Sequence, residues 1–193
     1  MKYDYIIVGA GSAGCVIANR LSEDPSTQVL LIEAGGSDRR FFIQMPIGYG
    51  VTYHQKAVNW MYMTEPSPDA DNKPSYWPRG KVMGGSSSIN AMVYVRGNSR
   101  DFDQWSEAGN PGWSYSDVLP YFKKMESWQN GPDDYRGGDG PLNVSEVSRQ
   151  LHPLCQNFLS AAQEIGIVLN KDMNGATQEG VGNYQITTHK GQR

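Results

Sequence analysis

The sequence has little of what nucleic-acid-binding, secreted and membrane-spanning proteins share. Its 193 residues carry a formal net charge of -3, from 17 basic and 20 acidic residues, so no excess positive charge is available for nucleic acid phosphates. Only two cysteines are present, Cys15 and Cys155, which argues against a disulfide framework and fits a reducing compartment. No apolar run reaches the roughly 18 residues that a membrane-spanning helix needs. We therefore expect a cytoplasmic protein without a nucleic acid partner.

The residues that are abundant indicate a loop-rich α/β protein. Hydrophobic residues make up 38% of the chain and aromatic residues 11%, and there are 22 glycines. These values are close to those of globular proteins and argue against disorder. The length allows one domain, or one domain and part of a second.

The first 33 residues have the pattern of a βαβ unit. Residues 3–8 form a short β-branched and aromatic run that predicts a buried strand. Residues 13–21 have helical apolar spacing, and residues 28–32 predict a second strand. Two strands joined by a helix within about thirty residues are typical of a parallel sheet. We expect the start of a doubly wound, Rossmann-like fold.

The rest of the chain is less regular. Residues 35–78 mix Pro, Gly and Asn with aromatics, which predicts an ordered excursion without long helices. A helix is predicted over residues 116–126, with Ser116 as its N-cap, and another over residues 153–165. The second helix has four apolar residues on one face: Phe158, Leu159, Ala162 and Ile165.

The first glycine cluster, "GAGSAG", has the spacing of a dinucleotide-binding turn. Gly9 permits the tight turn after the strand, Gly11 lets the backbone approach a pyrophosphate, and Gly14 lets helix and strand pack closely. The pyrophosphate would lie at the helix N-terminus, beside Ser12 and Ala13. A carboxylate that can accept from ribose hydroxyls is expected about twenty residues further on. Glu33 occupies that place, but the pattern leaves NAD and FAD as alternatives.

The second glycine cluster, "GKVMGGSSSIN", favours FAD. Gly84 and Gly85 can bring backbone close to a flat or anionic ligand, the following serines offer hydroxyl groups, and Asn90 offers an amide. The alternative is a flexible glycine-serine loop, but the apolar residues between the small ones argue against it. Such a segment suits the long body of a flavin dinucleotide.

Over essentially its whole length the chain resembles the glucose-methanol-choline (GMC) flavin oxidoreductases, especially their choline-dehydrogenase-like alcohol dehydrogenases and oxidases. The resemblance rests on "DYIIVGAGSAGCVIANRLSED", "LIEAGG" and "YWPRGKVMGGSSSINAMVYVRGNSRDFDQW", among other stretches. The longest of these is similar to the first signature of the family from Gly80 to Asp103.

The resemblance implies which residues hold FAD. Gly9 to Gly14 would contact the pyrophosphate, Glu33 the adenosine ribose, and Asn90 to Val93 the isoalloxazine. For Trp60 the alternative is an ordinary core aromatic, and for Arg79 it is a surface ion pair. The full set of expected cofactor-binding residues is Gly9, Gly11, Ser12, Ala13, Gly14, Glu33, Ala34, Trp60, Arg79, Val82, Gly84, Gly85, Ser86, Asn90, Ala91, Met92 and Val93.

One departure from the family concerns the bond to the cofactor. Some choline-oxidising members have, at the position of Ile89, a histidine that bonds covalently to the flavin. An isoleucine side chain cannot form that bond. We therefore expect FAD to be bound non-covalently, and we expect no metal.

The resemblance also implies that the catalytic base is absent from these residues. Alcohol oxidation needs a base for the hydroxyl proton and an oriented flavin that accepts hydride at N5. Family members supply a histidine and a partner histidine or asparagine from a segment beyond residue 193. His54, His152, His189 and Lys81 are poor substitutes. We expect no catalytic residue here, so the remaining C-terminal part, as a continuation or a second chain, must provide it.

The domain organisation and the activity follow as expectations. Residues 1–149 would form an incomplete FAD-binding domain, and residues 150–193 the beginning of an α+β substrate-binding domain. The substrate would be a small primary or secondary alcohol, with oxygen or a quinone as electron acceptor. The alternatives are an FAD-containing non-redox lyase of the same fold and an inactive dinucleotide-binding module.

Overall fold

The computed structural model describes residues 2–193 and divides into two compact units. The first unit runs to Met92 and also includes Gly191–Arg193, and the second unit is Val93–Lys190. This division separates compact bodies of this chain. The functional domain boundary expected near residue 150 stays a prediction.

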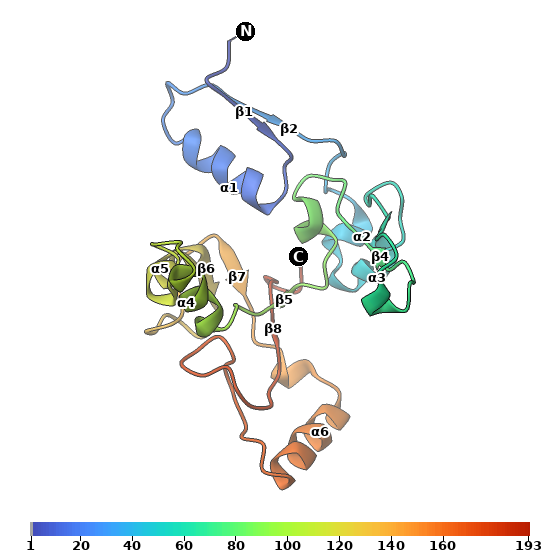
Figure 1. Ribbon diagram of the computed structural model, residues 1–193, viewed down its shortest axis with the longest axis vertical. Helices are drawn as coiled ribbons and strands as arrows, with labels where there is room; N and C mark the ends of the chain where they lie inside the picture. Colours follow the sequence, from blue (N-terminus) through green and yellow to red (C-terminus); the bar gives the residue numbers. More distant parts are fainter. Residues whose placement is uncertain (1) are drawn as a thin grey trace. The chain divides into compact units, whose positions relative to one another are not determined.

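The first unit begins with the βαβ arrangement (Figure 1). Strands β1 (Tyr5–Val8) and β2 (Val29–Ile32) pair in parallel, with Tyr5 opposite Val29 and Val8 opposite Ile32. Helix α1 (Ser12–Leu21) connects them and has Gly11 as its N-cap. The predicted βαβ unit is thus confirmed, with bounds shifted by one or two residues.

The expected burial of β1 is wrong for this chain. The Val8 side chain is 83% exposed and Ile6 is 61% exposed. Within the described residues β1 has one neighbouring strand, and the helix that packs on it is α1. A parallel sheet is normally covered on both faces, so the apolar composition of β1 suits a larger sheet than this chain forms.

The excursion after β2 is ordered and consists of short elements. A buried amide helps to organise it, since Asn59 donates to the Tyr53 carbonyl at 2.8 Å and accepts from the N–H groups of Met61 and Arg79. Its apolar core joins Ile43, Val58, Val82 and Ile89. The elements of this part are α2 (Phe41–Gln44), η1 (Pro46–Gly48), α3 (Tyr49–Thr52), β3 (Tyr62–Met63), η2 (Pro68–Ala70), β4 (Tyr76–Trp77) and η3 (Gly85–Ser88).

The second unit combines short strand pairs with three helices. Strands β5 and β8 pair antiparallel, and β6 and β7 pair in parallel. The predictions over residues 116–126 and 153–165 are confirmed as helices α5 and α6, whereas α4 lies in a stretch with no predicted helix. The elements are β5 (Val93–Tyr94), α4 (Ser99–Glu107), α5 (Tyr115–Met125), β6 (Glu126–Trp128), β7 (Leu142–Val144), η4 (Ser148–Gln150), α6 (Pro153–Glu164) and β8 (Gln185–Ile186).

One detail of the predicted helices needs correction. The N-cap of α5 is Ser114 and not Ser116, because Ser114 and Asp117 form a reciprocal capping box. The buried face of α6 consists of Leu159 and Ala162, whereas Phe158 is 69% exposed and Ile165, just past the helix end, is 77% exposed.

Two expectations about the whole chain can be compared with the described residues. Cys15 and Cys155 are both free and partly buried, so they form no disulfide. None of the helices found between residues 2 and 193 combines the length and apolar character needed to cross a bilayer. The cytoplasmic location stays a prediction.

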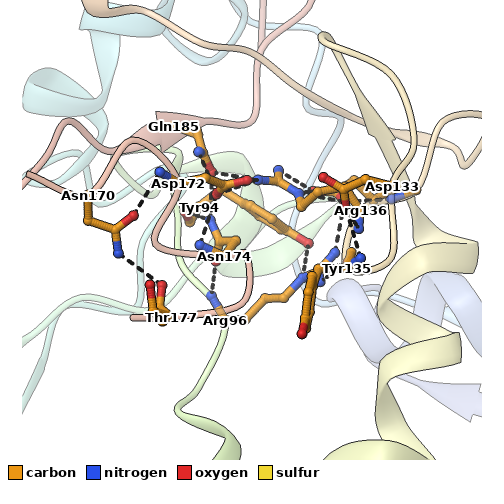
Figure 2. Close-up of polar contacts among 12 residues, drawn as sticks. Tyr94, Arg96, Asp133, Tyr135, Arg136, Asn170, Asp172, Asn174, Thr177 and Gln185 are labelled. Carbon is orange, nitrogen blue, oxygen red and sulfur yellow. Dashed lines mark hydrogen bonds and ion pairs between the residues drawn. The ribbon is translucent and has the colours of Figure 1, made fainter. Parts of the chain in front are cut away.

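The second unit is built around a buried network of charges (Figure 2). Glu126 at the start of β6 is fully buried and contacts Arg136 Nη2 at 2.6 Å and Arg96 Nη2 at 2.8 Å. Arg136 also contacts Asp172 at 2.7 Å, and the Gly137 N–H donates to Glu126. Burial acts to lower the pKa of Arg136, but hydrogen bonds and charge from Glu126 and Asp172 outweigh it and raise that pKa. The network therefore ties β6 to three loops, those that follow β5, β6 and α6.

We predict that Glu126→Gln strongly destabilises the second unit. Removing the Glu126 charge leaves the Arg96 guanidinium without a carboxylate partner and Arg136 with Asp172 alone, and breaking a buried ion pair in this way costs about 3–5 kcal/mol. Glu107→Gln, at the exposed end of α4, is the matched control. Urea unfolding of the intact protein should show a large loss for the first variant and almost none for the second. Equal stabilities would contradict a structural role for this network.

Candidate functional site

The two glycine clusters meet in the first unit. The Gly84 N–H donates to the Ala10 carbonyl at 2.8 Å, and Gly84 forms a parallel bridge with Gly11. One step earlier, the Met83 N–H donates to the Gly36 carbonyl at 2.9 Å. Residues 82–84 therefore lie beside both the turn after β1 and the segment that follows β2.

Two glycines are required by this close packing. A Cβ atom on Gly14 would lie 2.0 Å from the Gly9 carbonyl oxygen, so α1 could not pack against the turn. A Cβ on Gly85 would lie 2.9 Å from the Gly11 Cα, and Gly85 has a φ of +57°. The expectation that Gly14 serves close packing is confirmed. In the second cluster, Gly85 likewise allows its backbone to pack against Gly11.

The turn has the properties that a pyrophosphate needs. A Cβ atom added at Gly9 or Gly11 would have no heavy atom of the described residues within 4 Å, leaving out adjacent residues, so the space in front of the turn is open. Helix α1 begins at Ser12, and the first N–H groups of a helix have no partner within it. Open space in front of such N–H groups suits an anion. The residues present therefore fit the phosphates of a dinucleotide.

Glu33 holds the ends of the two strands together. Its Oε2 accepts from the Ala10 N–H at 2.8 Å, and its Oε1 accepts from the Gly35 N–H at 2.9 Å. No sequence pattern indicates these two contacts. Because each carboxylate oxygen can accept more than one hydrogen bond, Glu33 can still bind ribose hydroxyls.

Polar side chains hold η3 and the turn that follows it. The Ser86 hydroxyl accepts from the Gly80 N–H at 3.1 Å, and the Ser88 hydroxyl donates to the Met83 carbonyl at 2.7 Å. Asn90 Oδ1 accepts from the N–H of Met92, whose φ is +62°. Left-handed backbone is uncommon for a residue such as methionine, so this turn is strained and needs support.

The predicted cofactor-binding residues differ in how far their side chains are exposed to solvent. The Val82 side chain is fully buried in the apolar core, so only its backbone can face a ligand. Val93 lies in β5, which belongs to the second unit. Met92 is also buried. The exposed members are Ser12, Ala13, Ala34, Trp60, Arg79, Ser86, Asn90, Ala91 and Val93.

Trp60 and Arg79 lie on the surface of the first unit. The Trp60 ring is 42% exposed and stacks on Tyr62 at 5.9 Å, so it is not an ordinary core aromatic. The Arg79 guanidinium lies 4.7 Å above the Trp77 ring, and none of the ion pairs within residues 2–193 includes it. Their roles at a cofactor stay predictions.

Two of the histidines have local structural roles. His54 stacks on Tyr76 at 5.7 Å, and His152 caps α6 by accepting from the Leu154 N–H at 3.2 Å. The expectation that neither histidine is the catalytic base stays a prediction.

Comparison with known proteins assigns the family. The GMC oxidoreductase family matches residues 3–193. The chain belongs to the GMC oxidoreductases. It is 50% identical to an oxygen-dependent choline dehydrogenase of Photobacterium profundum, over 99% of this chain and 34% of that protein. It is also 50% identical to an alcohol dehydrogenase [acceptor] of Pseudomonas putida, over 99% of this chain and 35% of that protein.

A solved relative agrees in fold. Pyridoxine 4-oxidase from Mesorbium loti superposes with a TM-score of 0.93 and 34% identity, over 100% of this chain and 38% of that one. The chain spans about a third of the length of the curated relatives it matches. GMC oxidoreductases bind FAD, and this chain corresponds to their N-terminal FAD-binding part. The predicted family and α/β fold are confirmed, while the roles of individual residues stay predictions.

We predict that Gly14→Ala separates α1 from the turn that it packs on. The added methyl group would overlap the Gly9 carbonyl oxygen, and overpacking of this kind costs about 1–3 kcal/mol. Gly50→Ala in α3 is the control, because a Cβ there meets open space. Urea unfolding and the flavin content of the purified protein are the measurements. A Gly14→Ala protein with unchanged stability and flavin content would show that the close approach is dispensable.

Proposed function

We propose that these residues are the FAD-binding part of an oxidoreductase that converts a primary or secondary alcohol to a carbonyl compound. The observation that carries the proposal is the meeting of the two glycine clusters at the N-terminus of α1. Support also comes from relatives named as choline and alcohol dehydrogenases. We assign residues 1–149 to the FAD-binding domain and residues 150–193 to the start of the substrate-binding domain.

Each part of the cofactor has proposed contacts. The N–H groups at the start of α1 hold the pyrophosphate, and Glu33 accepts from the adenosine ribose while it keeps its two backbone contacts. The backbone of Gly84–Ser86 lies against the same cofactor, and Asn90–Val93 run beside the isoalloxazine. Ile89 is only 3% exposed and has a hydrocarbon side chain in the apolar core, which supports non-covalent binding.

The chemistry divides between the cofactor and the protein. FAD, when bound, supplies the acceptor for the hydride that leaves the carbinol carbon. The residues of this chain bind and orient it. We place the base that removes the hydroxyl proton in a part of the protein outside these residues, either a continuation or a second chain. The electron acceptor is oxygen or a quinone, and the location is the cytoplasm.

We predict that the intact protein purifies with FAD and that alcohols bleach it. Acid precipitation should release all of the flavin, because the binding is non-covalent. In the absence of oxygen, a substrate alcohol should abolish the visible absorption of the bound flavin. Choline and a panel of primary and secondary alcohols are the probes. Flavin that stays oxidised with every alcohol while the protein cleaves a cyanohydrin would instead indicate a lyase.

We predict that Glu33→Gln weakens FAD binding by about tenfold or more. A glutamine has an NH2 group in place of one carboxylate oxygen, so the N–H of either Ala10 or Gly35 would face another donor, and the charge-assisted character of the hydrogen bonds is lost. Glu65→Gln, at an exposed position of the same unit, is the control. Titration of the apoprotein with FAD gives both dissociation constants. Equal values would remove Glu33 from the site.

A further inference from the structure

Arg193 connects three backbone segments of the first unit. Its Nη1 donates to the Ser87 carbonyl at 2.8 Å and to Asn90 Oδ1 at 2.9 Å. Its Nη2 donates to the Asn90 carbonyl at 2.6 Å, and its Nε donates to the Ile43 carbonyl at 3.0 Å. The guanidinium group therefore joins the end of α2, the last turn of η3 and the Asn90 turn.

The acceptors around Arg193 are neutral. All four are carbonyl or amide oxygens, and the side chain is half-buried. Burial lowers the pKa of Arg193 from its ordinary value. A planar guanidinium can serve four acceptors in fixed directions, which an ammonium group cannot do. The arrangement suits a residue that orders backbone rather than one that neutralises a carboxylate.

The contact with Asn90 determines how that amide is oriented. Asn90 Oδ1 accepts both from Arg193 and from the Met92 N–H, which lies at the left-handed residue of the turn. Because Oδ1 accepts from two donors, the flipped amide is disfavoured, since it would place the Nδ2 group against the Arg193 guanidinium and the Met92 N–H. Arg193 thus supports a strained turn and selects one orientation of its amide.

We propose that Arg193 is a positioning residue for the cofactor. It acts through Asn90 by holding the turn from Asn90 to Met92 in the conformation that meets the isoalloxazine. This role rests on the proposed FAD function. It assigns a task to a residue that lies outside both glycine clusters and 103 positions from Asn90.

The experiment compares Arg193→Lys, Arg193→Ala and Arg39→Ala in the intact protein. Arg39 is an exposed arginine of the same unit and serves as the control. The readouts are the dissociation constant for FAD, the visible absorption spectrum of the bound flavin at saturating FAD, and the midpoint of unfolding. A purely structural role would change the midpoint without changing the spectrum of the saturated protein.

We expect both Arg193 variants to weaken FAD binding by about tenfold or more and to shift the flavin absorption bands. Lysine should not rescue, because it lacks the planar fork. In an Asn90→Ala background the further effect of Arg193→Ala on the flavin spectrum should be much smaller, because the contact to Asn90 Oδ1 is already lost. Its effect on the unfolding midpoint should remain, because the contacts to the Ile43, Ser87 and Asn90 carbonyls are still made. Should Arg193→Ala fail to fold, the Arg193→Lys comparison carries the test.

Three outcomes would overturn the role. They are an unchanged spectrum and FAD affinity in both variants, full rescue by lysine, or an effect on the flavin spectrum that adds fully to that of Asn90→Ala. A wild-type protein that binds no FAD is a different failure, because it contradicts the proposed function itself and removes the positioning role with it.

Discussion

The hydrogen bond from the Gly84 N–H to the Ala10 carbonyl is the contact on which the candidate site depends. Two backbones can come this close because Gly85 and Gly11 have no side chains between them. The contact places the segment before η3 against the turn from which α1 starts. An anion at the helix N-terminus and a flat group beside the following loop can then belong to one ligand. Both glycine clusters lack side chains where the two backbone segments approach each other.

Charged side chains stabilise the backbone segments around the glycine clusters, and another holds the second unit together. Glu33 accepts from Ala10 and Gly35, and so holds the carboxyl ends of β1 and β2 in register with the turn. Arg193 does the same for the Asn90 turn through four neutral acceptors. In the second unit the fully buried Glu126 bonds two arginines, which makes that unit depend on a balanced set of charges. In each case a single charged group satisfies several backbone or side-chain partners.

Local patterns predicted the βαβ unit, the glycine turn and the helices α5 and α6, because hydrophobic period and glycine spacing are local properties. Burial was harder to predict, since β1 has the composition of a covered strand but lacks cover in this chain. Helix α4 has few apolar residues, although two of them, Phe102 and Trp105, lie three positions apart as on one helix face. The Asn98 cap followed by Asp101 was a further signal for it. The hydrogen-bond partners of Glu33, Glu126 and Arg193 are mostly distant in sequence, so no local sequence pattern predicts these contacts.

A structure of the intact protein with its native cofactor would show whether the two glycine clusters share one ligand. We expect the FAD pyrophosphate to contact the backbone N–H groups of Gly11–Ala13. We also expect the backbone of Gly84–Ser86 to lie against the same FAD molecule. Density for the cofactor at another place, or a second glycine cluster separated from Gly11 in the loaded protein, would contradict this arrangement.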